Sequence, residues 1–254
     1  MSKIHSSNKK KIIILAIILV IIAGVYLNRA YSNIYGILGA ANLKPADGRG
    51  TYSINNMATT SLVYAALGDS LSAGVGTDNY QEVLPYLLAE KFAGGDKTVI
   101  LKNYSISGMK TAGIIASFLP AAINNSPDII TLLIGVNDIH DKVSVAKFAE
   151  NYEEILRRLR QGTRAEIYVI NIPFIGADSL MLPPYQSLFD GRTREFNEII
   201  KDLAAKYSVK YIDLYTPTVD LFKRSGDHYS SDLFHPSAAG YKLWAEIIYD
   251  NINK

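Results

Sequence analysis

Residues 61–71 read Ser-Leu-Val-Tyr-Ala-Ala-Leu-Gly-Asp-Ser-Leu, and this stretch decides the fold. It begins with an apolar run, residues 61–67, which is typical of a strand buried inside a parallel sheet. Gly68, Asp69 and Ser70 favour a turn directly after that strand. Because open α/β sheets bind ligands outside the carboxyl ends of their strands, Ser70 is a candidate functional residue.

The rest of the chain alternates between strand and helix patterns. Apolar runs predict further strands at residues 98–103, 128–134, 165–172 and 209–214. Helical spacing predicts helices at residues 80–92, 111–123, 143–160, 188–207 and 237–251. This alternation indicates an α/β fold in which a parallel five-stranded sheet carries helices on both faces. A long apolar loop is expected at residues 173–191, where α/β folds commonly place substrate contacts.

The N-terminus carries a pattern typical of a membrane segment. Residues 12–27 contain no charge and directly follow three lysines at positions 9–11. A helix of that length spans ~24 Å, slightly short of the ~30 Å hydrocarbon core, and the lysines together with Tyr26 cover the difference. We therefore expect residues 12–27 to be a transmembrane anchor. The basic tail, residues 1–11, then lies in the cytoplasm, and the body lies outside it at the cell membrane.

Two alternatives for this segment remain open. A cleaved signal peptide makes the protein secreted, although the residues after the apolar run, Asn28-Arg29-Ala30, form a poor cleavage site. A buried core helix is disfavoured because the segment is apolar on every face. Residues 28–60 are interrupted by Asn, Gly and Pro, so a spacer without a long element is expected there, or an irregular chain packed on the domain. The folded domain is expected at residues 61–254.

The bulk composition excludes several classes of function. The chain has 254 residues, of which 48% are hydrophobic, enough for a sizeable core. Its net charge of +2 becomes −2 once Lys3 and the lysines at 9–11 are set aside, so the body offers no basic face for nucleic acid. The absence of cysteine excludes disulfides, thiolate catalysis, cysteine-ligated metals and a lipoprotein anchor.

Polar groups suited to acyl transfer follow the predicted strands. Ser70 offers a hydroxyl nucleophile, which needs a neighbouring base. His235 is a suitable base, and Asp232 lies at the i, i+3 spacing from which a carboxylate orients an imidazole. A developing oxyanion needs preorganised donors. The N–H groups of Ser70 and Gly108 and the side-chain amide of Asn137 are the candidates.

These residues resemble the motifs of the SGNH or GDSL hydrolase family, of which GDSL-like lipases and acylhydrolases are members. The resemblance covers residues 61–252 and rests on four blocks in the family's order: Gly68-Asp69-Ser70-Leu71, the glycine block at 103–108, Gly135-Val136-Asn137-Asp138, and Asp232-Leu233-Phe234-His235. It implies a flavodoxin-like three-layer α/β/α fold, no cofactor, and hydrolysis of esters or thioesters. It also implies that Ser70, Asp232 and His235 are catalytic and that Ser70, Gly108 and Asn137 form the oxyanion hole.

Other interpretations stay open. The substrate is expected to be an ester, either a lipid or an O-acetylated cell-wall polysaccharide; a thioesterase, a lysophospholipase and a non-catalytic surface-binding module are the alternatives. Asp69 is interpreted as a structural residue of the turn. The competing interpretation is a metal site. The potential metal ligands of the chain form no compact ligand motif, and this interpretation leaves Ser70 without a role. These potential ligands are Asp138, His140, Asp141, Asp227, His228, Asp232 and His235.

Overall fold

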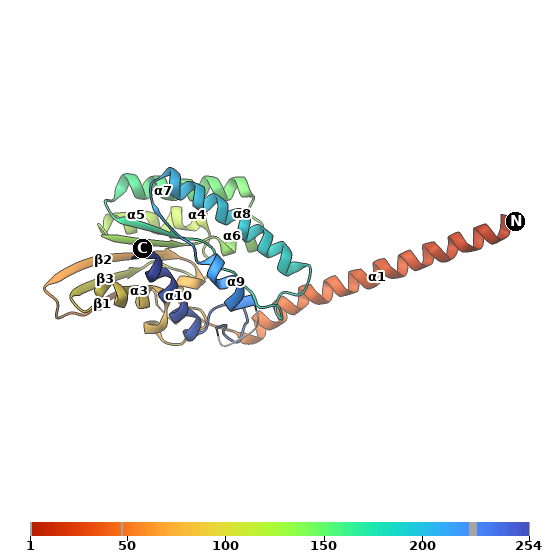
Figure 1. Ribbon diagram of the computed structural model, residues 1–254, viewed down its shortest axis with the longest axis horizontal. Helices are drawn as coiled ribbons and strands as arrows, with labels where there is room; N and C mark the ends of the chain where they lie inside the picture. The colour runs from red at the N-terminus through yellow and green to blue at the C-terminus, as the bar shows by residue number, and fades with distance from the viewer. Residues whose placement is uncertain (1, 47, 224–227, 254) are drawn as a thin grey trace.

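A computed structural model describes residues 2–46, 48–223 and 228–253 of the chain. A six-stranded sheet in the order β1-β3-β2-β4-β5-β6 forms its centre (Figure 1). The strands that follow β1 pair in parallel and confirm the five predicted strands: β2 (Thr60–Gly68), β3 (Lys97–Asn103), β4 (Ile129–Leu133), β5 (Glu166–Ile170) and β6 (Lys210–Ile212).

The remaining strand, β1 (Gly50–Ile54), corrects two expectations. It pairs antiparallel with β3, in a register that places Gly50 opposite Asn103 and Ile54 opposite Val99, so the sheet is mixed and has six strands. It also lies within residues 28–60, which were expected to be a spacer. Residues 50–54 form a strand because β1 covers the edge of β3 and brings the Ile54 side chain into the core.

Helices cover both faces of the sheet (Figure 1). One face carries α3 (Leu84–Ala93) and α10 (Ala238–Ile252), and the other carries α7 (Val145–Gly162) and α8 (Tyr185–Lys206) together with α4 (Thr111–Gly113) and α5 (Leu119–Asn124). A π-helical stretch, Ile114–Phe118, joins α4 to α5. Shorter elements complete the fold: α2 (Ser70–Ala73), a 3₁₀ turn (Tyr80–Glu82), α6 (Val136–His140) and α9 (Tyr215–Lys223). Helix α8 begins at Tyr185, so the loop expected to reach residue 191 is shorter than predicted.

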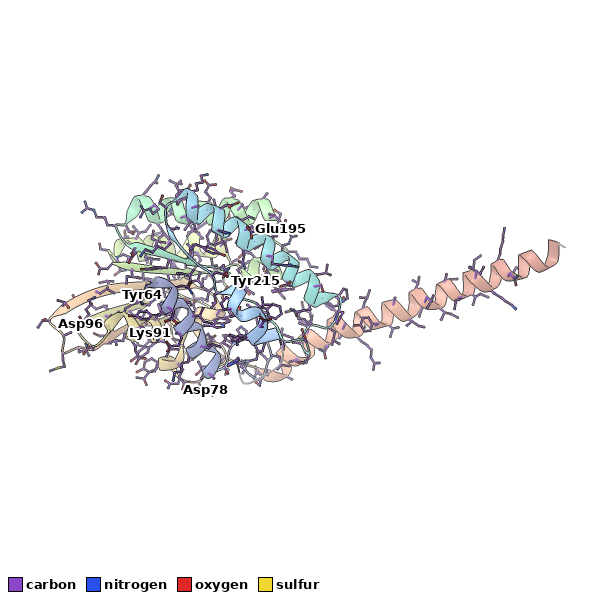
Figure 2. All side chains as sticks on the ribbon, viewed as in Figure 1. Tyr64, Asp78, Lys91, Asp96, Glu195 and Tyr215 are labelled. Atoms are coloured by element: carbon purple, nitrogen blue, oxygen red, sulfur yellow. The ribbon has the colours of Figure 1, made fainter. Side chains whose placement is uncertain are left out.

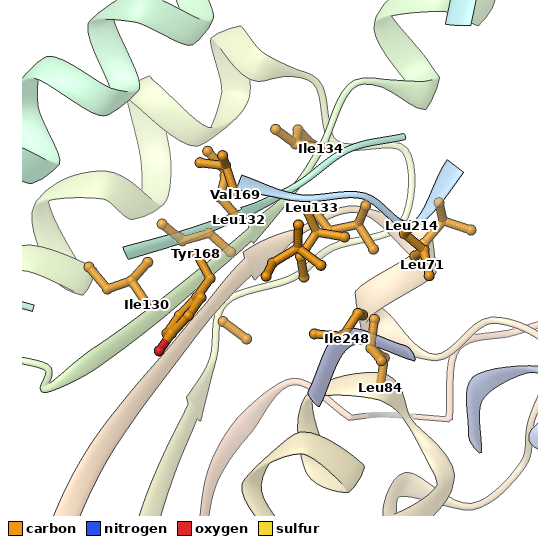
Figure 3. Close-up of a cluster of buried hydrophobic side chains, with 14 of the residues drawn as sticks. Leu71, Leu84, Ile130, Leu132, Leu133, Ile134, Tyr168, Val169, Leu214 and Ile248 are labelled. Atoms are coloured by element: carbon orange, nitrogen blue, oxygen red, sulfur yellow. The ribbon is translucent and has the colours of Figure 1, made fainter. Parts of the chain in front are cut away.

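The core fills both sides of the central strands. All five residues of β4 are buried, as expected for a strand covered on both faces. Figure 3 shows Ile130 and Leu132 of this strand beside Val169 of β5, with Leu71 and Leu84 among the neighbouring side chains. Burial of each such side chain contributes about 1.5–3 kcal/mol, so this layer holds the carboxyl ends of the strands in fixed positions.

Helix α1 (Ser2–Ala41) is long and changes character along its length. Residues 8–29 are exposed on every side, whereas the last three turns bury one face against the body. That face consists of residues at helical spacing, of which Ala30 is buried and the others are half-buried: Asn33, Ile34, Ile37, Leu38 and Ala41. Residues 28–41 are therefore helical rather than part of a spacer. Gly36 and Gly39 each weaken a helix by about 1 kcal/mol, and the packing of the buried face offsets this.

Within α1, the part from Asn8 to Ala41 is long and apolar enough to cross a membrane, and an N-terminal signal sequence meets the same criterion. Figure 1 shows α1 projecting from the end of the body opposite the loop that joins β1 to β2.

Candidate active site

The turn after β2 presents Ser70 as the first residue of α2. Asp69 caps this helix because its Oδ1 accepts the Leu71 N–H at 3.0 Å. Gly68 is required at the end of the strand, since a Cβ there would lie 2.8 Å from the Leu133 carbonyl oxygen and 2.5 Å from Ser72 Oγ. The Ser70 residue is only 4% exposed, so its hydroxyl lies in a largely desolvated position.

Ser70, His235 and Asp232 come together in one chain of hydrogen bonds. The Ser70 Oγ lies 2.9 Å from His235 Nε2, and His235 Nδ1 lies 2.6 Å from Asp232 Oδ2. A carboxylate only accepts hydrogen bonds, so the proton belongs on Nδ1, and Nε2 is left to accept the Ser70 hydroxyl. This is the geometry in which an imidazole removes a proton from a serine.

The loop around Asp232 fixes the carboxylate. Its Oδ1 accepts three hydrogen bonds: from Ser230 Oγ at 2.8 Å and from the N–H groups of Phe234 and His235, each at 2.9 Å. Burial raises the pKa of Asp232, but the hydrogen bond and charge of His235 and the backbone donors outweigh it and hold the pKa below its usual value. The group therefore stays ionised opposite His235. Ser230 belongs to no recognisable sequence block, and its contact with Asp232 follows only from the folded loop.

The segments that carry the candidate oxyanion groups contact one another. The loop after β3 is tied to the nucleophile strand, because the Ile106 N–H donates to the Gly68 carbonyl at 3.3 Å. Asn137 on α6 contacts the same loop through a 3.1 Å hydrogen bond from Nδ2 to the Met109 carbonyl. Gly108 has a φ of +79°, a left-handed conformation that favours glycine. Across the part of the chain that the structure describes, the N–H groups of Ser70 and Gly108 have no hydrogen-bond acceptor in the protein.

Asp138, on α6, holds this arrangement together through its buried carboxylate. Its two carboxylate oxygens accept the Thr111 N–H at 3.0 Å and the Thr111 hydroxyl at 2.6 Å, and Asn151 Nδ2 donates to that hydroxyl at 3.1 Å. Burial raises the pKa of Asp138, against the opposing effect of the Thr111 hydrogen bonds. These contacts join α6 to the start of α4 and so set the position of Asn137. Neither Thr111 nor Asn151 carried a signal in the sequence.

Two further buried side chains support the nucleophile turn. Asn103 Nδ2 donates to the carbonyls of Gly48 and Ser72 at 2.8 and 3.3 Å. The Tyr241 hydroxyl donates to the Val75 carbonyl at 2.7 Å. Asp69 is fully buried, and burial raises its pKa to about 7, against the lowering effect of the Leu71 N–H. It lies in the turn as the structural residue expected from sequence.

The potential metal ligands named from the sequence do not form a metal site among the described residues. In the ranges 2–46, 48–223 and 228–253, no group of three or more His, Asp or Glu side chains is arranged to hold a metal ion. Asp138 is engaged by Thr111, and the exposed His140 pairs with Asp141 at 2.9 Å. Asp227 lies outside the described residues.

Comparison with known proteins agrees with this geometry. The sequence profile of the GDSL-like Lipase/Acylhydrolase family matches residues 66–243. The spore germination lipase LipC of Bacillus licheniformis is 27% identical over 212 residues, which cover 73% of this chain and 93% of LipC.

Two solved structures share the fold. The lipase/acylhydrolase of Enterococcus faecalis superposes with a TM-score of 0.61 at 23% identity, covering 75% of this chain and 95% of the other. The esterase EstA of Pseudoalteromonas, crystallised with monoethylphosphonate as inhibitor, gives a TM-score of 0.60 at 20% identity, covering 75% and 96%. With the family profile spanning more than half of its length, the chain belongs to the GDSL-like lipase/acylhydrolase family and is a carboxylic ester hydrolase.

Proposed function

We propose that this hydrolase cleaves carboxylic esters through an acyl-enzyme on Ser70 and that its catalytic domain lies outside the cytoplasm on a membrane anchor. The observation that carries the mechanism is the continuous hydrogen-bonded chain from Ser70 Oγ through His235 to Asp232, with distances of 2.9 and 2.6 Å. The phosphonate inhibitor named for EstA is a reagent class that captures serine nucleophiles, which supports the same chemistry here.

The reaction proceeds in two halves. Ser70 Oγ attacks the ester carbonyl while its proton passes to His235 Nε2, and the Ser70 and Gly108 N–H groups together with Asn137 stabilise the oxyanion. The imidazolium then protonates the departing alkoxide, leaving the acyl group on Ser70. A water molecule then gives its proton to the same nitrogen and attacks the acyl carbonyl. The bond between the acyl carbon and Ser70 Oγ breaks, His235 Nε2 returns the proton to Ser70 Oγ, and the carboxylic acid leaves. Asp232 stays ionised throughout and stabilises the imidazolium.

The topology rests on the N-terminal charges. The lysines at 9–11 precede the exposed apolar part of α1, and positive residues flank the cytoplasmic side of single spans. An uncleaved α1 then carries residues 28–254 out of the cytoplasm. Export with cleavage gives a secreted enzyme with the same site.

Substitution of Ser70 tests the mechanism. We expect Ser70→Ala to lower kcat for a p-nitrophenyl ester on the order of 10⁴-fold or more and to abolish labelling by a fluorophosphonate probe. Ser72→Ala is the matched control, because Ser72 lies on the same short helix and is equally buried, and we expect it to keep turnover and labelling. Retained turnover in Ser70→Ala overturns the mechanism, and a wild-type protein that neither turns over nor labels indicates a binding module.

A further inference from the structure

We propose that the catalytic domain rests on the membrane with the carboxyl edge of its sheet facing the bilayer, so that esters reach Ser70 from the lipid side. The lipid-contact surface consists of residues 182–188 together with Tyr26 and Tyr31 of α1. This inference builds on the membrane anchor proposed above and specifies how the anchor orients the site.

The anchor is docked on the domain rather than tethered to it. Asn33 Nδ2 donates to the carbonyls of Ser179 and Leu180, each at 3.0 Å, and the Tyr185 hydroxyl donates to the Leu27 carbonyl at 3.3 Å. Ala30 is completely buried in this contact. The apolar run ends at Leu27, so no flexible segment separates the expected span from the body. The orientation of α1 therefore fixes the orientation of the domain.

The docked end of α1 lies against the segments that carry the active site. The Tyr35 hydroxyl is 3.4 Å from His140 Nε2 on α6, the helix that also carries Asn137. After α1, the Ala46 N–H donates to the Gly74 carbonyl at the end of α2, the helix that begins with Ser70.

A third contact runs through the loop that holds Asn33. The Ala177 N–H of this loop donates at 3.0 Å to the carbonyl of Leu233, within the Asp232–His235 block.

The direction of the parallel strands also places the carboxyl edge of the sheet on the side of α1. Figure 2 places Asp96, which precedes β3, at the end of the body far from α1, and Tyr215, which follows β6, closer to it. The parallel strands therefore run towards the side from which α1 projects (Figure 1). A bilayer around the exposed part of α1 faces the carboxyl edge of the sheet, where Ser70 lies.

The chemistry of the surface suits a headgroup boundary. Leu188 is 65% exposed at the start of α8, and the Tyr185–Leu27 contact puts that start level with the end of the apolar run. Tyr26 and Tyr31 are each 46% exposed, and tyrosines concentrate at membrane interfaces because one end is apolar and the other polar. Beside them, Arg29 lines an open cavity of about 520 Å³, where its charge suits a lipid phosphate.

Single-cysteine labelling tests the orientation directly, because the chain contains no cysteine of its own. Leu188→Cys carries an environment-sensitive fluorophore on the proposed contact surface. Met57→Cys is the control: Met57 is 93% exposed and lies in the turn before β2, at the opposite pole of the sheet. The nine residues of β2 at ~3.3 Å each put about 30 Å between the two ends.

The measurement uses the full chain in phosphatidylcholine–phosphatidylglycerol vesicles that contain doxyl-labelled lipids. We expect the label at position 188 to be quenched by doxyl groups near the headgroups and the label at 57 to be unaffected. Equal quenching at both positions, or none at 188, overturns the proposal, and the latter outcome fits a site turned towards cell-wall polymer. Protein that does not float with the vesicles also overturns it. Turnover of a soluble p-nitrophenyl ester by the same samples reports separately on the proposed mechanism.

Discussion

The two carboxylate oxygens of Asp232 face different partners. Oδ1 accepts from Ser230 Oγ and from the N–H groups of Phe234 and His235, so only an oxygen fits that position. In Asp232→Asn, the amide oxygen occupies it and the NH₂ group faces His235 Nδ1. Nδ1 must then accept, its proton moves to Nε2, and the base for Ser70 is lost. We expect kcat for a soluble ester to fall on the order of 10⁴-fold with the fold retained by circular dichroism.

Ser230→Ala is the control for this prediction. It removes one donor from Oδ1 but leaves the carboxylate and its charge opposite His235. We expect kcat to fall by less than about tenfold, which corresponds to about 1.4 kcal/mol. An Asp232→Asn variant that performs as well as Ser230→Ala contradicts the tautomer argument.

Asp69 makes the stability of the protein depend on pH. Its pKa rises from 3.8 to about 7 on folding because the carboxyl group is fully buried. The folded state therefore favours the neutral acid, and this contribution to stability is complete below pH 3.8 and is lost as the pH rises to about 7. The full rise corresponds to about 4 kcal/mol.

Asp69→Asn removes the titrating group while an amide oxygen still caps Leu71. We expect the free energy of unfolding of the variant, relative to wild type, to increase on the order of 2–4 kcal/mol between about pH 4 and about pH 8. Urea unfolding at several pH values measures this difference. The prediction concerns how the difference in free energy of unfolding between the two proteins changes with pH, not its size at one pH. A difference that stays constant across the range contradicts the raised pKa of Asp69.

Elements with a strong local pattern were predictable from sequence. β4 is apolar apart from Thr131 because both faces of the strand are covered, and α7 shows a buried stripe at helical spacing. The same holds for the proposed catalytic groups: Ser70 follows an apolar run, and Asp232 and His235 share one turn. Their meeting in space follows from parallel strands, whose carboxyl ends lie at one edge of the sheet.

Elements held by distant partners were not predictable. β1 has five residues and exists because β3, far along the chain, offers its edge. The last turns of α1 contain Gly36 and Gly39, which disfavour a helix. The contact of these turns with the body stabilises the helix there. The roles of two single polar residues could not be predicted either, because each depends on a partner that only the fold brings close. Thr111 donates to Asp138, and Asn103 donates to the Gly48 carbonyl.

Helix α1 and the catalytic domain form one unit, because the last turns of α1 contact residues 179–185 and α6. In the proposed membrane-anchored topology, the length and stiffness of the junction between the span and the domain set how the site meets the membrane. A rigid junction holds the carboxyl edge at one tilt and height, whereas a flexible one lets the domain rotate away from the lipid. Orientation of this kind affects only substrates that are themselves held in the bilayer.

Insertion of a flexible segment separates the two cases. About ten Gly/Ser residues placed between Val25 and Tyr26 leave the docked turns and the Leu27 contact intact and give the junction an r.m.s. reach of about 18 Å. We expect kcat/KM for a soluble p-nitrophenyl ester to be unchanged and hydrolysis of a long-chain ester embedded in vesicles to fall several-fold, as orientation is lost. A helical insert of two turns is the control, since it raises the domain by about 11 Å without freeing its tilt. Equal loss on both substrates indicates misfolding, and unchanged vesicle activity with the flexible insert contradicts a site oriented by its anchor.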